Sequence, residues 1–202
     1  DAEHNYQYDY DILPGDEPDL KRGFNIFEER ENTDNETIIS SFNSIFDTEL
    51  RFNDQWKLSS QVGIQWDQSS QEQYVGENTF NMRNIREDSS YDENQYIVPK
   101  GGMHTVNNAT TSQITWKVQG EYKNTFNDIH DIQIMAGSEI RKNWYNTQFT
   151  AGYGYDPKTL TTKPLNIRND KDAEKYKLHT KTYQENAFAS FYTTGSYSFM
   201  SR

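Results

Sequence analysis

Three carboxylates at alternate positions form the strongest candidate metal site in the sequence. Asp170, Asp172 and Glu174 would supply oxygen ligands of the kind that Ca²⁺ prefers. The pattern departs from an EF-hand loop, because Lys175 stands at the sixth position, where the turn needs glycine, and Lys181 stands at the twelfth. A solvated loop of mixed charge explains the same residues. These carboxylates therefore remain a weak candidate, and we predict neither a resident metal nor a cofactor.

Other residues with reactive side chains do not form a recognised catalytic pattern. The four histidines stand alone, without His-Glu-x-x-His or other ligand spacing. The pair Gly152 and Gly154 is too short for a phosphate-binding loop, and no helix is expected after it. The chain has no cysteine and no Gly-x-Ser-x-Gly motif, and its 31 acidic residues make chance carboxylate pairs uninformative. We predict that the protein is not an enzyme.

The composition is polar but rich in aromatic residues. Of 202 residues, 33% are hydrophobic and 14% aromatic, the net charge is -11 and the mean hydropathy is -1.06. Disordered tails rarely carry so many aromatic side chains. Thirty-one acidic against 20 basic residues argue against binding to nucleic acid. No segment approaches the roughly 18 consecutive apolar residues of a spanning helix, which leaves membrane strands open.

Alternating apolar and polar residues predict five strands. In the first, Phe42 and Phe46 share one face while Asp47 and Arg51 share the other. The same period recurs in four later segments. The predicted strands are about 36–52, 56–67, 112–126, 132–144 and 185–199.

The connections between these strands alternate in length. Short turns are predicted at 53–55 and 127–131, and long polar loops at 68–111 and 146–183; residues 1–35 are predicted to form a further polar, acidic outer loop. Successive antiparallel hairpins would place both short turns at one end of the sheet. Short turns at one end and long loops at the other are typical of outer-membrane barrels. We predict an all-β, antiparallel up-and-down meander over residues 36–202, a segment of a transmembrane β-barrel.

Aromatic residues ten positions apart support the membrane interpretation. At about 3.3 Å per residue and a tilt of roughly 40°, ten residues climb about 25 Å, the height of the apolar band between two aromatic girdles. Lipid would then cover one face of the strands, which explains the low apolar fraction. The predicted girdle residues are Phe42, Phe52, Trp56, Trp66, Trp116 and Phe126.

Aromatic residues in and beside the long loops are candidate contacts for a solute or a partner protein. Tyrosine and tryptophan offer large rigid faces with a polar group, although the same rings also serve to anchor loops to one another. Alanine at Tyr153 and Tyr155 is therefore expected to impair uptake or partner binding without affecting barrel assembly. The candidates are Tyr74, Phe80, Tyr91, Tyr96, Trp144, Tyr145, Tyr153 and Tyr155.

Three segments resemble one known family. ENAFASFYTTGSYSFMSR at 185–202, GYGYDPKTLTT at 152–162 and DIQIMAGSEIR at 131–141 are similar to the barrel of SusC/RagA-type TonB-dependent outer-membrane transporters of Bacteroidetes. The resemblance implies a plugged barrel of about 22 strands in the outer membrane of a Gram-negative cell. It also implies import of glycans or peptides, a SusD-like surface lipoprotein as partner, and energy supplied through TonB.

The resemblance covers barrel strands and their loops only. Transport and contact with TonB are therefore expected to need parts of a parent protein outside these 202 residues. The alternative is a soluble, secreted β-sandwich that binds glycans through loop aromatics. The position of Trp56, Trp66 and Trp116 separates the two: a sandwich would enclose them between sheets, whereas a barrel would expose them to lipid.

Overall fold

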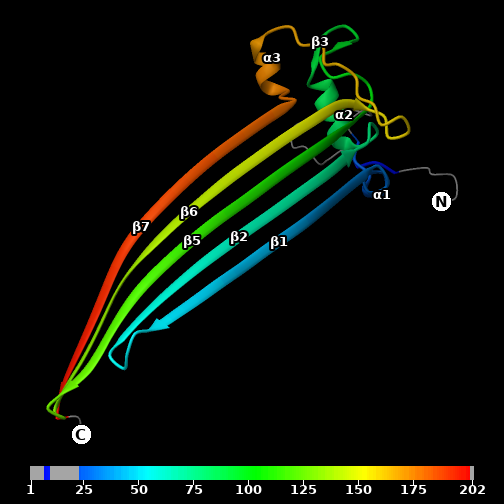
Figure 1. Cartoon of the computed structure of the whole chain (residues 1–202). Helices are drawn as coiled ribbons and strands as arrows, with labels where there is room; N and C mark the ends of the chain where they lie inside the picture. The colour runs from blue at the N-terminus through cyan, green and yellow to red at the C-terminus, as the bar shows by residue number, and fades with distance from the viewer. Residues whose placement is uncertain (1–6, 10–22, 201–202) are drawn as a thin grey trace. The chain divides into compact units, whose positions relative to one another are not determined.

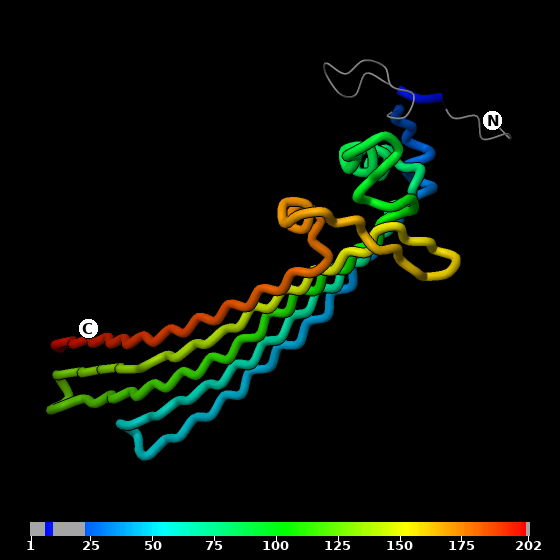
Figure 2. Tube along the Cα trace, turned by 90° about the horizontal axis from the view of Figure 1, so that it is seen from above, coloured from blue at the N-terminus to red at the C-terminus, as the bar shows by residue number. Residues whose placement is uncertain are grey.

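A five-stranded antiparallel sheet is the main element of the protein. The computed structural model describes residues 7–9 and 23–200. Figures 1 and 2 show, from two directions, the strands side by side in chain order, β1-β2-β5-β6-β7. The predicted antiparallel meander is confirmed. The strands are β1 (Thr33–Arg51), β2 (Trp56–Val75), β5 (Gly102–Phe126), β6 (His130–Tyr155) and β7 (His179–Phe199).

Both predicted short turns are stabilised by the residues that the sequence places there. The side-chain oxygen of Asn53 accepts hydrogen bonds from the backbone N–H groups of Gln55 and Trp56, at 2.9 and 2.8 Å. Asn127 and Asp128 have φ angles of 51° and 56°, a left-handed conformation that these residue types tolerate. The first turn lies beside β5, because the backbone N–H of Lys123 donates to the carbonyl of Gln55 at 2.9 Å.

The chain divides into two compact units. The first, here called the strand unit, contains the central parts of the strands and both short turns. The second, the loop unit, contains the long connections and the adjoining strand ends. The strand unit comprises residues 39–68, 109–146 and 182–200, and the loop unit the described residues among 1–38, 69–108 and 147–181.

One face of the strand unit is polar. The side-chain amide of Gln61 donates to Asp47 at 2.7 Å, and Lys57 forms an ion pair with Glu121 at 3.0 Å. These contacts join odd-numbered residues of β1, β2 and β5, as the period predicts. We call the surface formed by Asp47, Lys57, Gln61, Glu121 and the residues aligned with them the polar face.

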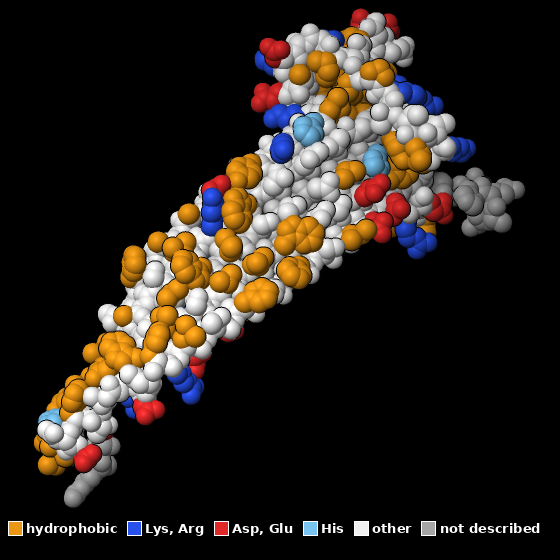
Figure 3. Space-filling view, viewed as in Figure 1, with side chains coloured by type: hydrophobic (Ala, Val, Ile, Leu, Met, Phe, Trp, Pro, Cys, Tyr) orange, Lys and Arg blue, Asp and Glu red, His pale blue; other side chains and the backbone are white. Residues whose placement is uncertain are grey.

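The opposite face of the strand unit carries exposed aromatic residues. The indole N–H of Trp116 donates to Ser60 at 3.0 Å, and the rings of Trp56 and Tyr122 lie 4.7 Å apart. Trp56, Trp66 and Trp116 are 51%, 37% and 50% exposed. Figure 3 shows hydrophobic side chains distributed along the visible surface of the sheet. We call this surface, defined by Trp56, Trp66, Trp116 and the residues aligned with them, the aromatic face.

The sheet arrangement does not support the sandwich alternative. Within the described residues, the only other sheet is the two-stranded pair of β3 (Ser90–Asp92) and β4 (Gln95–Tyr96), which belongs to the loop unit. This sheet is too short to form the second layer of a sandwich. The three tryptophans, which a sandwich would bury, are exposed.

The polar face also carries a few apolar side chains. Ile39 in β1 is 71% exposed there, and Ile45 is exposed as well. In β7, the ring of Tyr192 lies over Gly137 of β6, so that a Cβ at Gly137 would come within 2.4 Å of the ring. The Tyr192 hydroxyl donates to Gln119 of β5 at 3.3 Å. Tyr192 therefore joins three strands on the polar face.

Short helices occupy the long connections, where the sequence indicated only loops. Each begins with a side chain that accepts backbone N–H groups: Asn25, Thr79 and Asn169, respectively. No helix in the described residues has the length and apolar character required to cross a membrane. The helices are α1 (Ile26–Glu31), α2 (Phe80–Glu87) and α3 (Asp170–Lys175).

The predicted loop boundaries at 35, 68, 111, 146 and 183 are therefore wrong. In the described part of 1–35, α1 is followed by β1 from Thr33, while residues 1–6 and 10–22 of that predicted loop lie outside the described residues. β2 and β6 continue to Val75 and Tyr155, and β5 and β7 begin at Gly102 and His179. The extensions of β2, β5 and β7 carry polar residues on both faces, so they lack the alternation that identifies a strand.

Candidate functional site

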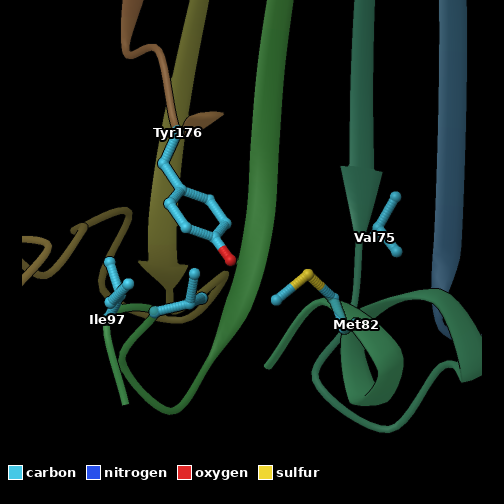
Figure 4. Packing of buried hydrophobic residues seen from close by; sticks show 5 residues of the cluster. Val75, Met82, Ile97 and Tyr176 are labelled. Carbon is cyan, nitrogen blue, oxygen red and sulfur yellow. The ribbon is translucent and has the colours of Figure 1, made fainter. Parts of the chain in front are cut away.

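The long connections fold together around a hydrophobic core of their own. Figure 4 shows Val75 from the end of β2, Met82 from α2, Ile97 from the segment after β4, and Tyr176 from the end of α3. Together with the fully buried Val98 they form one cluster. Segments that are far apart in sequence therefore hold one another in a defined arrangement.

Two glycines allow the backbones of the loop unit to approach closely. Gly101 has a φ of +140°, and a Cβ there would lie 2.6 Å from the carbonyl carbon of Gly154. Gly154 has a φ of +62°, and its own Cβ would lie within 3 Å of Lys163 and Pro99. Both φ values lie in the region that favours glycine. Gly154 of the Gly152–Gly154 motif thus has a packing role that the sequence did not indicate.

Tyr74 and Tyr155 belong to a group of stacked rings in the loop unit. The ring of Tyr155 stacks on His104 at 4.8 Å and meets Tyr74 edge-on at 5.6 Å. The ring nitrogen Nε2 of His104 lies 2.7 Å from a carboxylate oxygen of Glu72. The structure therefore brings two of the predicted contact tyrosines together and adds a histidine and a glutamate to them.

Tyr153 lies in β6 and packs against the hydrophobic cluster instead of standing at a loop tip. Its ring meets that of Tyr176 edge-on at 6.2 Å. The arrangement favours the structural alternative considered for these aromatics, in which the ring supports the loops.

Replacing Tyr153 with alanine is expected to destabilise the loop unit by about 2 kcal/mol, because it removes a partly buried ring from a small core. Limited proteolysis should show faster cleavage within 69–108 and 147–181. Tyr145→Ala is the matched control, since Tyr145 is exposed in the strand unit and should tolerate the change. Equal cleavage of both variants would contradict the packing role.

Tyr91 and Tyr96 each lie beneath an arginine. The guanidinium carbon of Arg168 is 4.0 Å from the ring centroid of Tyr91, and that of Arg86 is 4.3 Å from the ring centroid of Tyr96. Arg168 also donates to Asp172 at 3.2 Å. The two stacks differ in that Arg168 has a carboxylate partner, whereas Arg86 forms no ion pair with any described residue.

A cavity of about 440 Å³ lies beside the second of these stacks, within the loop unit. Charged groups of both signs line it, and Met82 from the hydrophobic cluster contributes to its wall. Its volume falls within the range of small-molecule sites. The lining residues are Glu77, Asn78, Met82, Arg83, Arg86, Glu87, Tyr96, Lys100 and Gly101.

Sequence reasoning identified Tyr96 but missed the basic residues around it. Arg83 and Arg86 are three positions apart, which places them on one face of a helix. The sequence signal for that helix is Thr79, a residue type that favours the N-cap position and caps α2 in the structure. The surrounding Asn, Gln and Ser residues favoured the loop interpretation instead.

Of the remaining aromatic candidates, Phe80 lies in α2, where its ring meets that of Phe24 edge-on at 5.9 Å, while Trp144 and Tyr145 lie in the strand unit. The ammonium group of Lys142 is 5.2 Å from the ring centroid of Trp144 and forms an ion pair with Glu185 of β7. Tyr145 is exposed. Both residues are part of β6.

The weak metal candidate is part of α3. Residues two positions apart on a helix point in nearly opposite directions, which separates Asp172 from Asp170 and Glu174. The Asp172 carboxylate instead forms an ion pair with Arg168 at 3.2 Å. Across residues 7–9 and 23–200, no three His, Cys, Asp or Glu side chains gather in a way that would hold a metal ion.

Two pKa shifts in the loop unit have structural causes. Burial, reinforced by the Glu28 carboxylate, raises the pKa of Tyr8. The backbone N–H of Lys158, which donates to Asp156 at 2.9 Å, holds the pKa of that carboxyl below its usual value. Neither group lines the cavity, so these shifts do not indicate a proton-transfer site.

Comparison with known proteins supports the fold. No family model and no curated protein matches the sequence. The structure is similar to the RagAB peptide transporter, with a TM-score of 0.64, and to the RagAB peptide importer in its 'closed-closed' and 'open-open' states, with TM-scores of 0.63 and 0.64. In each case the identity is 14% and the match covers 85% of this chain.

The matched region is a small part of those transporters. This chain spans 17% of the length of each transporter chain that it matches. At 14% identity the likeness concerns the fold alone. It agrees, at that coarse level, with the SusC/RagA-like fold that the sequence resemblance implied.

Proposed function

We propose that this chain forms part of the barrel wall and the outer loops of a TonB-dependent outer-membrane transporter. This transporter, with a SusD-like surface lipoprotein as its partner, imports glycans or peptides. It carries out no catalysis. The observation that carries the proposal is the antiparallel sheet with one exposed aromatic face and one polar face, whose fold is similar to part of the RagAB peptide transporter.

The aromatic face fits contact with lipid. Trp56 and Trp66 lie on it ten residues apart in β2, and this spacing matches the roughly 25 Å apolar band of an outer-membrane barrel. In such a position Phe42, Phe52, Trp116 and Phe126 complete the two girdles. Exposed rings that would be unfavourable in water are then stabilised by the acyl chains and headgroups.

The polar face fits the interior of a plugged barrel. The pairs Gln61–Asp47 and Lys57–Glu121 satisfy polar groups that water or a plug domain would otherwise have to satisfy. Ile39 and Ile45 on the same face offer small apolar contacts to a plug. A plug supplied by another part of the parent protein is compatible with both features.

The loop unit suits a role outside the membrane. Residues 163–183 hold six basic and three acidic side chains, a net charge of +3, whereas residues 1–35 hold eleven acidic and three basic ones, a net charge of -8. Opposite charges on these two segments would complement a lipoprotein lid that carries charges of both signs. The core of the loop unit keeps such a surface in a fixed shape.

Cell fractionation and growth experiments test the proposal. The full-length protein is expected in the outer-membrane fraction and in solution only after detergent is added. Deleting its gene should abolish growth on a specific peptide or glycan nutrient, and complementation should restore growth only in cells with functional TonB. Recovery as a soluble secreted protein without detergent would instead support the glycan-binding sandwich.

A further inference from the structure

The cavity in the loop unit contains two cations that form no ion pair within the described residues. Arg86 and Lys100 line it, and neither forms an ion pair or a side-chain hydrogen bond with any described residue. Arg83 differs, because its guanidinium is paired with the buried carboxylate of Glu28 at 3.0 Å. The positive charge available to a ligand therefore comes from Arg86 and Lys100.

Arg86 is held in position by its surroundings. Thr79 caps α2, Met82 anchors the helix in the hydrophobic cluster, and the ion pair of Arg83 ties the helix to α1. The ring of Tyr96 lies against the flat side of the Arg86 guanidinium at 4.3 Å. A stacked guanidinium keeps the N–H groups at its edge free to donate.

We propose that this cavity binds a carboxylate group of a solute through Arg86 and Lys100. A guanidinium matches the two oxygens of a carboxylate with two parallel N–H···O bonds, and a nearby ammonium adds a third donor. A cavity of about 440 Å³ accommodates a group the size of an amino-acid residue or a monosaccharide. The C-terminus of a peptide and a uronic acid residue of a glycan both supply this chemistry.

The acidic residues of the cavity provide a test of the sign of the ligand charge. Glu77 and Glu87 line it, and neither forms an ion pair with another residue that the structure describes. If the recognised group is a carboxylate, these residues weaken its binding by repulsion. Glu87→Gln should therefore strengthen binding, whereas a cationic ligand would bind less tightly to that variant.

Calorimetric titration of the full-length protein in detergent at low salt tests the proposal. The probes are N-acetyl-tetra-alanine with a free or an amidated C-terminus, and trigalacturonate with the neutral maltotriose as its counterpart. At least one carboxylate probe should bind about tenfold more tightly than its neutral counterpart. The pair that shows the preference identifies a peptide or a uronate as the source.

Arg86→Met should abolish this preference, and Lys100→Met should reduce it. Arg168→Met is the matched control, because Arg168 also stacks on a tyrosine but does not line the cavity. Unchanged near-UV circular dichroism would show that each variant is folded. Equal binding of charged and neutral probes to the unmodified protein, a preference retained by Arg86→Met, or weaker binding by Glu87→Gln would overturn the proposal.

The biological role of this cavity rests on the proposed transport function, but the binding measurement does not. Titration in detergent requires neither TonB nor a lipoprotein. A protein that binds the carboxylate probe and fails in the growth experiment would leave the cavity assignment intact and contradict the transport proposal. The reverse result would contradict the cavity assignment alone.

Discussion

Replacing Gly101 with alanine is expected to unfold the loop unit. The φ of +140° is strongly unfavourable for alanine, and the new Cβ would lie 2.6 Å from the backbone of Gly154, which is not free to rotate away as a side chain would be. We expect a cost of about 3 kcal/mol or more, which is large for a unit with so few buried apolar residues.

Limited proteolysis of the full-length protein checks this expectation. Cleavage within 69–108 and 147–181 should become rapid, while the heat-resistant migration of the folded barrel on gels persists. Gly120→Ala is the control, because a Cβ at Gly120 would meet only the carbonyl oxygen of Ala136, at 4.0 Å. Resistance of Gly101→Ala to protease would show that the two backbones do not approach so closely.

Arginine at Val62 is expected to prevent membrane assembly, whereas arginine at the adjacent Gln61 is expected to be tolerated. Val62 lies between Trp56 and Trp66 on the aromatic face, where a charge near the middle of the lipid costs about 2–4 kcal/mol. Gln61 lies on the polar face beside Asp47, so an arginine there gains a carboxylate partner.

The quantity to measure is the folded, heat-modifiable protein in the outer-membrane fraction. Val62→Arg should reduce it severalfold, and Gln61→Arg should leave it near the level of the unmodified protein. Equal behaviour of the two variants would contradict the assignment of the faces. A stronger defect for Gln61→Arg would reverse the assignment.

The sequence was sufficient to predict the strand unit because each of its strands has two different faces. Between Trp56 and Trp66 the alternation identifies the strand, its faces and the aromatic spacing at once. The polar extensions of β2 and β5, up to Val75 and from Gly102, have no such contrast between faces. The sequence pattern therefore predicts a loop there that is 44 residues long, from 68 to 111.

The site was less predictable than the sheet because its geometry depends on distant pairs. The sequence identified Tyr91 and Tyr96 as candidate contacts, but nothing near them indicates that one lies under Arg168 and the other under Arg86. The approach of Gly101 to Gly154 likewise joins segments more than 50 residues apart. Such pairings follow from the packing of the whole loop unit and not from local composition.

The two faces of the strand unit also restrict how its strands can change length during evolution. Deleting one residue between Trp56 and Trp66 would turn Trp66 toward the polar face. Deleting two would keep every side chain on its face and bring the two rings about 6.6 Å closer along the strand. Insertions and deletions in these segments should therefore accumulate in even numbers. The exposed turn at 156–161 has no face to preserve, so its length can change one residue at a time.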